Sequence, residues 1–230
     1  MLAGIGASWL TRLEQGRANR VSAEVLDSLA TALRLSGPER LHLFSLADVR
    51  PAPQAVGVAA APEAHQRLVT GLHPNPAYVL DPAWNLACWN DAEAALFPVL
   101  RVDRDPEESG PNLLRLMLET PELRIFMSDW DDEIDRLTRE FRLHLAQYPN
   151  DHGDELAAQL RDTHPEFAAA WERHDVTVFA PQTRRFQHRE LGPLRFDHHR
   201  LLLPDHPGWL VVIYTPVAHD PTADRFASLL

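Results

Sequence analysis

The 230-residue sequence is poor in cysteine, lysine and long apolar runs. Cys88 is the only cysteine, which excludes a disulfide bond within the chain and a zinc site built from several cysteines. All 22 basic residues are arginine, a bias that we expect from a bacterial genome of high GC content. The longest apolar stretches, such as Trp209–Tyr214, are far too short to cross a bilayer as a helix. Because the first residues show no signal-peptide pattern, we expect a cytoplasmic protein without a membrane partner.

The motifs of common enzymes are also missing. There is no Gly-x-Ser-x-Gly nucleophile elbow, no glycine-rich phosphate loop and no His-Glu-x-x-His motif. Cys88 lies in an apolar strand pattern, which favours a buried small side chain over a nucleophile. We therefore expect that the protein is not an enzyme.

Two groups of metal-binding residue types are better explained without a metal. His198 and His199 are adjacent, and neighbouring residues of a strand point to opposite faces, so one ion could not easily bind both. His206 does not complete the spacing of ligands that a zinc finger requires. The acidic residues between Asp129 and Glu133 lack the alternation and central glycine of a calcium loop, and they suit the start of a helix. We expect no metal site.

The net charge of −11 is unevenly distributed along the chain. Residues 1–50 hold six arginines against five acidic residues, whereas the remainder holds 16 arginines against 28 acidic residues. The acidity therefore belongs to the larger segment. A surface that contacts DNA phosphates remains compatible with the smaller one, since local charge governs such contacts.

The segment from Ser8 to Arg17 carries the clearest motif. Leu10 and Leu13 fall on one face of a short amphipathic helix, and Gly16 follows at the usual position of a helix C-cap. A glycine-rich turn precedes the helix and basic residues follow it. This arrangement is typical of the second, DNA-reading half of a helix-turn-helix.

Farther along, the pattern predicts two more helices, then a linker and a second domain. Ser22 is a suitable N-cap for a helix through Leu33, and Ser36–Pro38 separates that helix from the next. Residues 51–65 are rich in proline, alanine and glycine without periodicity, which predicts a linker. We therefore divide the chain into a partial helix-turn-helix domain (1–50), the linker (51–65) and a larger domain (66–230).

The larger domain combines strand and helix patterns. Its predicted strands are 77–80, 84–89, 176–179, 194–196, 200–203 and 209–215, and its predicted helices are near 91–97 and over 113–118, 130–147, 155–161, 166–173 and 221–230. Strands, a helical middle and further strands indicate an α+β fold in which helices lie on one face of a largely antiparallel sheet.

Several of these segments together resemble a known bacterial family. They are 11–17, 25–35, 76–81, Trp89-Asn90, 112–115 and Pro165-Glu166-Phe167 with Trp171, His174 and Asp175. The sequence is similar to XRE-type helix-turn-helix regulators that carry a C-terminal MmyB-like ligand-binding domain. The resemblance implies a lambda-repressor-like DNA-binding domain and a PAS-like α/β sensor domain with an apolar pocket for a fatty-acid-like ligand.

The predicted DNA-binding residues are Ser8, Trp9, Arg12, Gln15, Arg17 and Arg20. Residues near the start of the reading helix face base edges in the major groove, where Arg12 could bind a guanine through two hydrogen bonds. Arg17 and Arg20 follow the helix and suit phosphate contacts. Trp9 could contact a thymine methyl group or a sugar, or simply cover a neighbouring helix.

The predicted ligand-binding residues are Tyr78, Trp89, Asn90, Phe97, Phe126, Trp130, Trp171 and His174. They are large apolar side chains with a few polar groups, as ligand pockets require. The alternative for each is an ordinary place in the core, and Asn90 also suits a structural helix cap.

Members of the family carry further helices before the reading helix. Met1–Ala3 is at most the end of the second of these helices, so we expect a start farther upstream or weak DNA binding by this chain. Each fully buried large side chain that loses its partners costs about 1.5–3 kcal/mol.

We interpret the protein as a transcription regulator with three expected partners: an operator DNA, a small apolar ligand and a second copy of itself. No cofactor is expected beyond a bound fatty acid or similar molecule. The ligand would favour a dimer whose reading helices are wrongly spaced for two half-sites. The alternatives are a truncated dimerisation partner that does not bind DNA, and a PAS-like module that holds a cofactor such as haem or flavin.

Overall fold

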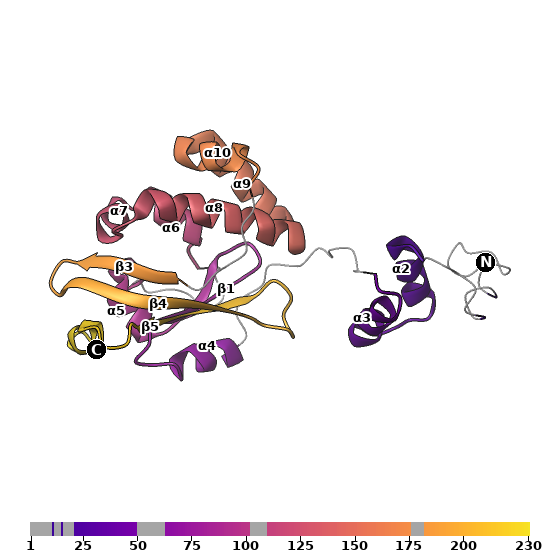
Figure 1. Ribbon diagram of the computed structural model, residues 1–230, viewed down its shortest axis with the longest axis horizontal. Coiled ribbons are helices and arrows are strands. Elements are labelled where there is room, and N and C mark those ends of the chain that lie inside the picture. The colour runs from indigo at the N-terminus through magenta and orange to yellow at the C-terminus, as the bar shows by residue number, and fades with distance from the viewer. Residues whose placement is uncertain (1–10, 12–14, 16–20, 50–62, 102–109, 176–181) are drawn as a thin grey trace. The chain divides into compact units, whose positions relative to one another are not determined.

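The computed structural model describes residues 11, 15, 21–49, 63–101, 110–175 and 182–230 (Figure 1). The chain divides into two compact units, Met1–Pro53 and Gln54–Leu230, and the division falls within the predicted linker. The elements are α2 (Ala23–Ala32), α3 (Gly37–Leu46), α4 (Glu63–Thr70), β1 (Ala77–Leu80), β2 (Leu86–Trp89), α5 (Asp91–Leu96), the short 3₁₀ turn η1 (Pro98–Leu100), α6 (Leu113–Glu119), α7 (Pro121–Phe126), α8 (Trp130–Gln147), α9 (Asp151–Thr163), α10 (Pro165–Glu172), β3 (Gln182–His188), β4 (Gly192–Leu202), β5 (Leu210–Pro216) and α11 (Thr222–Ala227).

In the first unit, α2 and α3 form a packed helix pair. The Ser22 side chain accepts a hydrogen bond from the backbone of Val25, which confirms the predicted N-cap. Arg40 of α3 reaches back to Asp27 of α2, with 2.5 Å between guanidinium nitrogen and carboxylate oxygen. Phe44 of α3 is buried, and α2 and α3 pack against each other. The two predicted helices after the reading helix are therefore present.

The second unit contains a five-stranded sheet in the order β2-β1-β5-β4-β3, and all neighbouring strands are antiparallel. The α+β class and the antiparallel sheet are thus confirmed. The PAS-like character implied by the family resemblance stays a prediction.

Helices cover both faces of this sheet, which corrects the expectation of a one-sided layer. Tyr78 and Leu80 of β1 belong to the main core beneath α5, α6 and α8, whereas Ala77 and Val79 face a smaller core that Val69 of α4 closes. Figure 1 shows α4 on the side of the sheet opposite to α6, α7 and α8. Successive residues of a strand alternate between faces, so every residue of β1 is buried. Cys88 of β2 lies in the smaller core, as predicted for a small apolar side chain.

Several element assignments need correction. The predicted strands 194–196 and 200–203 are parts of the single long strand β4. α4, β3 and α7 were not predicted, because α4 begins inside the predicted linker, β3 carries mostly polar residues and α7 is only six residues long. The predicted linker is three residues too long, since α4 begins at Glu63. The predicted strand 176–179 lies outside the described residues.

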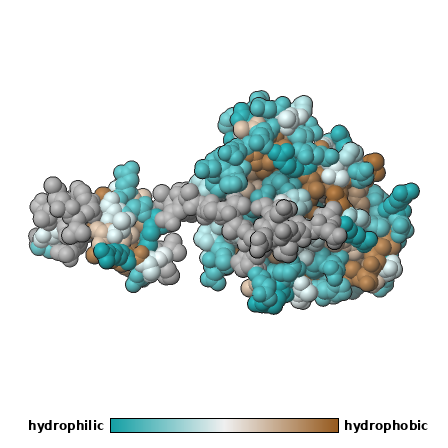
Figure 2. Space-filling model, turned by 180° about the vertical axis from the view of Figure 1, so that it is seen from behind, coloured by the Kyte–Doolittle hydropathy of each residue, from teal (hydrophilic) through white to brown (hydrophobic). Residues whose placement is uncertain are grey.

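The surface in Figure 2 is mostly hydrophilic, with hydrophobic side chains exposed in separate patches. Large exposed apolar side chains include Ile125, Leu201 and Leu202. None of the helices in the described part of the chain combines the length and apolar character that a bilayer crossing requires.

Candidate ligand-binding pocket

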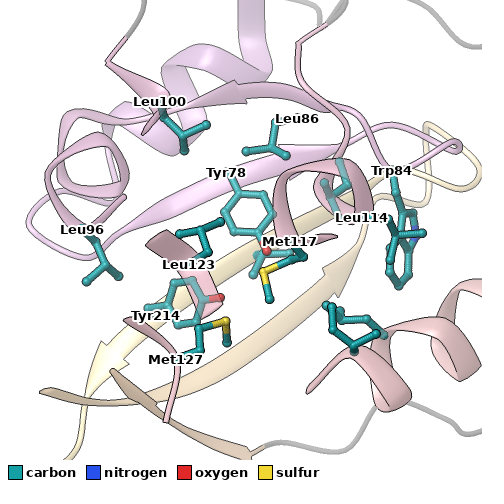
Figure 3. Close-up of a cluster of buried hydrophobic side chains, with 14 of the residues drawn as sticks. Tyr78, Trp84, Leu86, Leu96, Leu100, Leu114, Met117, Leu123, Met127 and Tyr214 are labelled. Atoms are coloured by element: carbon teal, nitrogen blue, oxygen red, sulfur yellow. The ribbon is translucent and has the colours of Figure 1, made fainter. Parts of the chain in front are cut away.

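An apolar pocket lies in the main core of the second unit, between the sheet and the helical layer. Figure 3 shows several of its side chains converging from β1, β2, α6 and β5. The pocket is lined by Tyr78, Leu86, Glu93, Phe97, Val99, Leu100, Leu113, Leu116, Met117, Leu123, Met127, Glu133, Leu137, His198, Arg200 and Tyr214. We call this set the apolar pocket. Its lining is mostly aliphatic and aromatic with a few polar groups, the composition of small-molecule sites.

The open space inside the apolar pocket is small, about 40 Å³. A water molecule needs at least ~10–15 Å³ measured in this way, and pockets for drug-sized ligands span ~300–1,000 Å³. The apolar pocket that the family resemblance implies is therefore nearly filled in this conformation. A larger guest requires the lining to move, and Met117 and Met127 are the side chains best suited to such movement, because methionine is unbranched and flexible.

Glu93 places a carboxyl group inside this apolar lining. It lies in the first turn of α5, where the Asn90 side chain accepts a hydrogen bond from the Glu93 backbone at 2.9 Å. The Glu93 side chain is buried, and its Oε2 has no hydrogen-bond partner among the described residues. Burial raises the pKa of Glu93 well above its ordinary value, since an unpaired charge in an apolar site is costly. The carboxyl group is thus poised to act as a neutral donor and acceptor.

Two phenols and a histidine complete the uncharged polar side of the apolar pocket. Burial, followed by the neighbouring carboxyl of Glu93, raises the pKa of Tyr78. Burial likewise raises the pKa of Tyr214, whose ring stacks on His198 with 5.0 Å between centroids. Burial, and next the positive charge of Arg184, lower the pKa of His198 well below its ordinary value, which keeps the imidazole neutral.

A buried ion network adjoins the apolar pocket and consists of Glu133, Arg136 and Glu140 of α8 with Arg184 of β3 and Arg200 of β4. Glu133 pairs with Arg136 and Arg184, and Glu140 pairs with Arg136 at 2.5 Å and Arg200 at 2.7 Å. On its other side, residues of the network line a polar cleft of about 410 Å³ between α8 and β3. The network holds three cations and two anions, so its formal charge is positive.

The structure brings only two of the predicted ligand-binding residues to the apolar pocket, Tyr78 and Phe97. The others lie outside its lining. Trp89 and Phe126 pack against the main core, and Trp130 is buried and donates a hydrogen bond to the Met117 carbonyl at 3.3 Å.

At the far end of the helical layer, Trp171 of α10 stacks on Phe167, with 5.5 Å between ring centroids. His174 follows that helix and is exposed. Neither residue lines the apolar pocket.

Asn90 performs a structural task, the alternative considered for it. Its carbonyl oxygen accepts hydrogen bonds from the backbone of Ala77 and Glu93, and its amide donates to the carbonyls of Val69 and Asn75. These bonds tie α4, β1 and α5 together and thereby place Glu93 in the apolar pocket.

Sequence patterns missed most of the lining, including Glu93, Met117, His198 and Arg200. The aliphatic residues were indistinguishable from core, because periodicity shows that a side chain is buried but not whether space adjoins it. Glu93 carried a usable signal, since a carboxylate on the apolar face of a short helix is unusual.

Most of the predicted DNA-contacting residues, Ser8, Trp9, Arg12, Arg17 and Arg20, lie outside the described residues. Gln15 is described and exposed, and its backbone N–H donates to the carbonyl of Thr11 at 3.1 Å, the spacing of a helical turn.

The predicted absence of a metal site was argued from His198, His199 and the acidic run. His198 is buried, whereas His199 bonds to Thr215 at 2.9 Å on the neighbouring strand. Asp131, Asp132 and Glu133 lie in the first turn of α8. Within the part of the chain that the structure describes, no three His, Cys, Asp or Glu side chains form a group that could hold a metal ion.

Comparison with known families agrees with this two-part organisation. Residues 1–43 match the model of a helix-turn-helix domain, and residues 61–230 match that of the MmyB-like transcription regulator ligand binding domain. The chain is therefore a transcription regulator that joins a helix-turn-helix domain to a ligand-binding domain. It belongs to the family of MmyB-like transcription regulators. A search of curated proteins found no match.

Proposed function

We propose that this protein is a bacterial DNA-binding regulator that senses a small apolar or fatty-acid-like molecule in the apolar pocket. The observation that carries the proposal is the composition of the apolar pocket: aliphatic, aromatic and methionine side chains enclose a few polar groups, and Glu133 and Arg200 of the ion network also reach its lining. The positive formal charge of the adjoining ion network supports a ligand with an acidic head, because an anion there would balance the excess cation. The protein would act in the cytoplasm as a homodimer on a two-part operator.

The sensing mechanism is a shift between two conformations. In the described conformation the apolar pocket is nearly filled. A ligand therefore favours a second conformation, in which the side chains that line the apolar pocket have moved apart. The ligand changes DNA binding only if that open state differs in its affinity for the operator. PAS-like character and the identity of the DNA-contacting residues are parts of the same proposal.

The direct test is thermal unfolding of the full chain with saturated fatty acids of eight to sixteen carbons. A ligand that binds only the folded protein at 100 times its Kd adds about 2.7 kcal/mol to the free energy of unfolding, so Tm should rise by several degrees. Leu116→Trp, which fills the apolar pocket from α6, should abolish this rise. Leu118→Trp on the same helix, outside the lining, is the matched control and should retain it.

No rise in Tm with any fatty acid would contradict the proposal, as would an equal rise in both variants. If the purified protein absorbs strongly at wavelengths longer than those of its aromatic side chains, a cofactor-binding module is favoured instead.

A further inference from the structure

A second cleft, here called the Trp84 cleft, lies where the C-terminal half of α8 meets β4, β5 and the β1–β2 turn. It has a volume of about 230 Å³ and is lined by Trp84, Glu140, Leu143, His144, Gln147, Tyr148, Arg200, Leu202 and Leu210. It shares only Arg200 with the apolar pocket. The Trp84 cleft is thus a separate site of larger open volume.

Trp84 lines this cleft and carries a buried hydrogen-bond donor. Its side chain is fully buried, and its Nε1 has no hydrogen-bond partner among the described residues. The ring packs against Phe141 and His144, with 5.1 Å and 5.9 Å between centroids. Its backbone φ is +66°, a left-handed conformation that is rare for a bulky side chain and that tends to occur at functional sites.

His144 supplies an acceptor. The ring hydrogen-bonds to the backbone at Gly208 and Pro82, and its Nε2 has no partner among the residues described. Burial, and next the positive charge of Arg200, lower the pKa of His144 to about 4, so the ring is neutral near neutral pH. Because the backbone carbonyls use the single ring proton on Nδ1, Nε2 presents a lone pair.

The charges that face the Trp84 cleft cancel. Glu140 and Arg200 are both almost completely buried and form an ion pair at 2.7 Å. Arg200 also lies over the Trp84 ring, 5.0 Å from its centroid. An anionic guest would meet the Glu140 carboxylate and the His144 lone pair, and a cationic guest would meet Arg200. An uncharged guest avoids both penalties.

We propose that the Trp84 cleft binds a small uncharged molecule with an apolar body and a hydroxyl group, which donates to Nε2 of His144 and accepts from Nε1 of Trp84. A hydroxyl carries one donor and two acceptor lone pairs, so a single hydroxyl group can satisfy both orphaned atoms. Leu143, Leu202 and Leu210 surround the apolar body. This site goes beyond the proposed sensing function and does not depend on what occupies the apolar pocket.

The volume of the Trp84 cleft sets the size of the probe. An apolar cavity of ~150 Å³ accommodates benzene, so a cleft of about 230 Å³ suits a benzene ring with one further polar group. Benzyl alcohol meets this requirement. Toluene, benzoate and benzylammonium are matched compounds that lack the hydroxyl or carry a charge.

The experiment titrates each compound into the full chain and follows the indole N–H resonances by proton–nitrogen correlation NMR. The Trp84 signal is assigned through its contacts with Phe141. Benzyl alcohol should shift it saturably and bind about tenfold or more tightly than the three other compounds, since each of them leaves a buried partner unmatched or buries a charge.

Two exposed positions provide matched variants that should fold normally. Gln147→Phe fills the mouth of the Trp84 cleft and should abolish the shift, whereas Ala146→Phe, one residue earlier and outside the lining, should retain it. His144→Leu removes the acceptor and should erase the preference for benzyl alcohol over toluene.

The proposal is overturned if benzyl alcohol leaves the Trp84 resonance unmoved, if toluene binds equally well, or if the shift persists in Gln147→Phe. Contact of the Trp84 N–H with a bound water that no compound displaces would also overturn it.

Discussion

At the scale of single residues, burial controls the chemistry of this domain by changing which groups carry charge. Burial shifts the pKa values of Glu93 and His144 in opposite directions: it raises the pKa of Glu93 and lowers that of His144. Each group is therefore neutral over a wider pH range than in an unfolded chain. This neutrality allows Glu93 in the apolar pocket and His144 in the Trp84 cleft to take part in hydrogen bonds without adding a charge to the buried ion pairs nearby.

The lowered pKa of His144 predicts a specific loss of stability in acid. Between pH 6.5 and about 4 the unfolded chain takes up a proton at this position and the folded chain does not, so stability present above pH 6.5 is lost as the pH falls. The loss attributable to His144 amounts to about 3 kcal/mol at most. His144→Gln should remove it, which urea unfolding at pH 7 and pH 4.5 would measure. His73→Gln, a substitution at an exposed position, should retain the wild-type decrease in stability between the two pH values.

At the scale of elements, α8 organises the second unit because two of its faces are buried. The predicted apolar stripe of Ile134, Leu137, Phe141 and Leu145 faces the main core. A polar stripe with the same helical spacing, Glu133, Arg136 and Glu140, holds the strands β3 and β4 through the ion network. A charged residue on a helix usually indicates a solvated face. That rule does not hold here, because Arg184 of β3 and Arg200 of β4 form ion pairs with the glutamates of this stripe.

The ion network should be intolerant of losing one member. Glu140→Gln leaves Arg136 and Arg200 buried with one partner fewer, and removing one partner from a buried pair typically costs about 3–5 kcal/mol. Chemical unfolding should show a decrease of that order. Glu63→Gln breaks the exposed pair with Arg67 and should change stability by no more than about 0.5 kcal/mol. Equal effects of the two substitutions would contradict a buried, coupled network.

Elements with a regular apolar pattern were predicted well from the sequence, and elements with mostly polar residues were not. The bounds of α8 were predicted correctly at 130–147, and those of β1 at 77–80, because their periodicity is strong. β3 was not predicted because only two of its positions, 184 and 186, are buried, and one of them is an arginine, Arg184. A sequence pattern treats arginine as exposed, and only the carboxylate of Glu133, 51 residues earlier in the chain, makes its burial favourable.

At the scale of the whole molecule, charge separates the two parts. The first 50 residues are close to neutral and the remainder is strongly acidic. An acidic domain repels DNA, so binding depends on the arginines of the helix-turn-helix domain and on the salt concentration.

This dependence can be measured on a duplex that the protein selects from a random library. Arg17→Ala should lower the slope of log affinity against log salt by about 0.9 if it contacts one phosphate. Arg12→Ala should instead reduce the preference for the selected sequence by about 1–3 kcal/mol. Arg189→Ala, an exposed arginine of the ligand-binding domain, should change neither quantity. If Arg17→Ala has the same slope of log affinity against log salt as the wild type, the proposed phosphate contact is excluded.

The amino-acid sequence by itself determined the two-part organisation, the class of regulator, the N-caps at Ser22 and Asn90 and most of the helices, since these depend on interactions between near neighbours in the chain. Tertiary structure alone decided which side chains border open space and which charges are paired. The lining of the apolar pocket comes from β1, β2, α5, η1, α6, α7, α8, β4 and β5, and that of the Trp84 cleft comes mainly from the β1–β2 turn, α8 and the strands β4 and β5. Cavities and buried ion pairs arise where segments far apart in the chain meet, and no local pattern records that meeting.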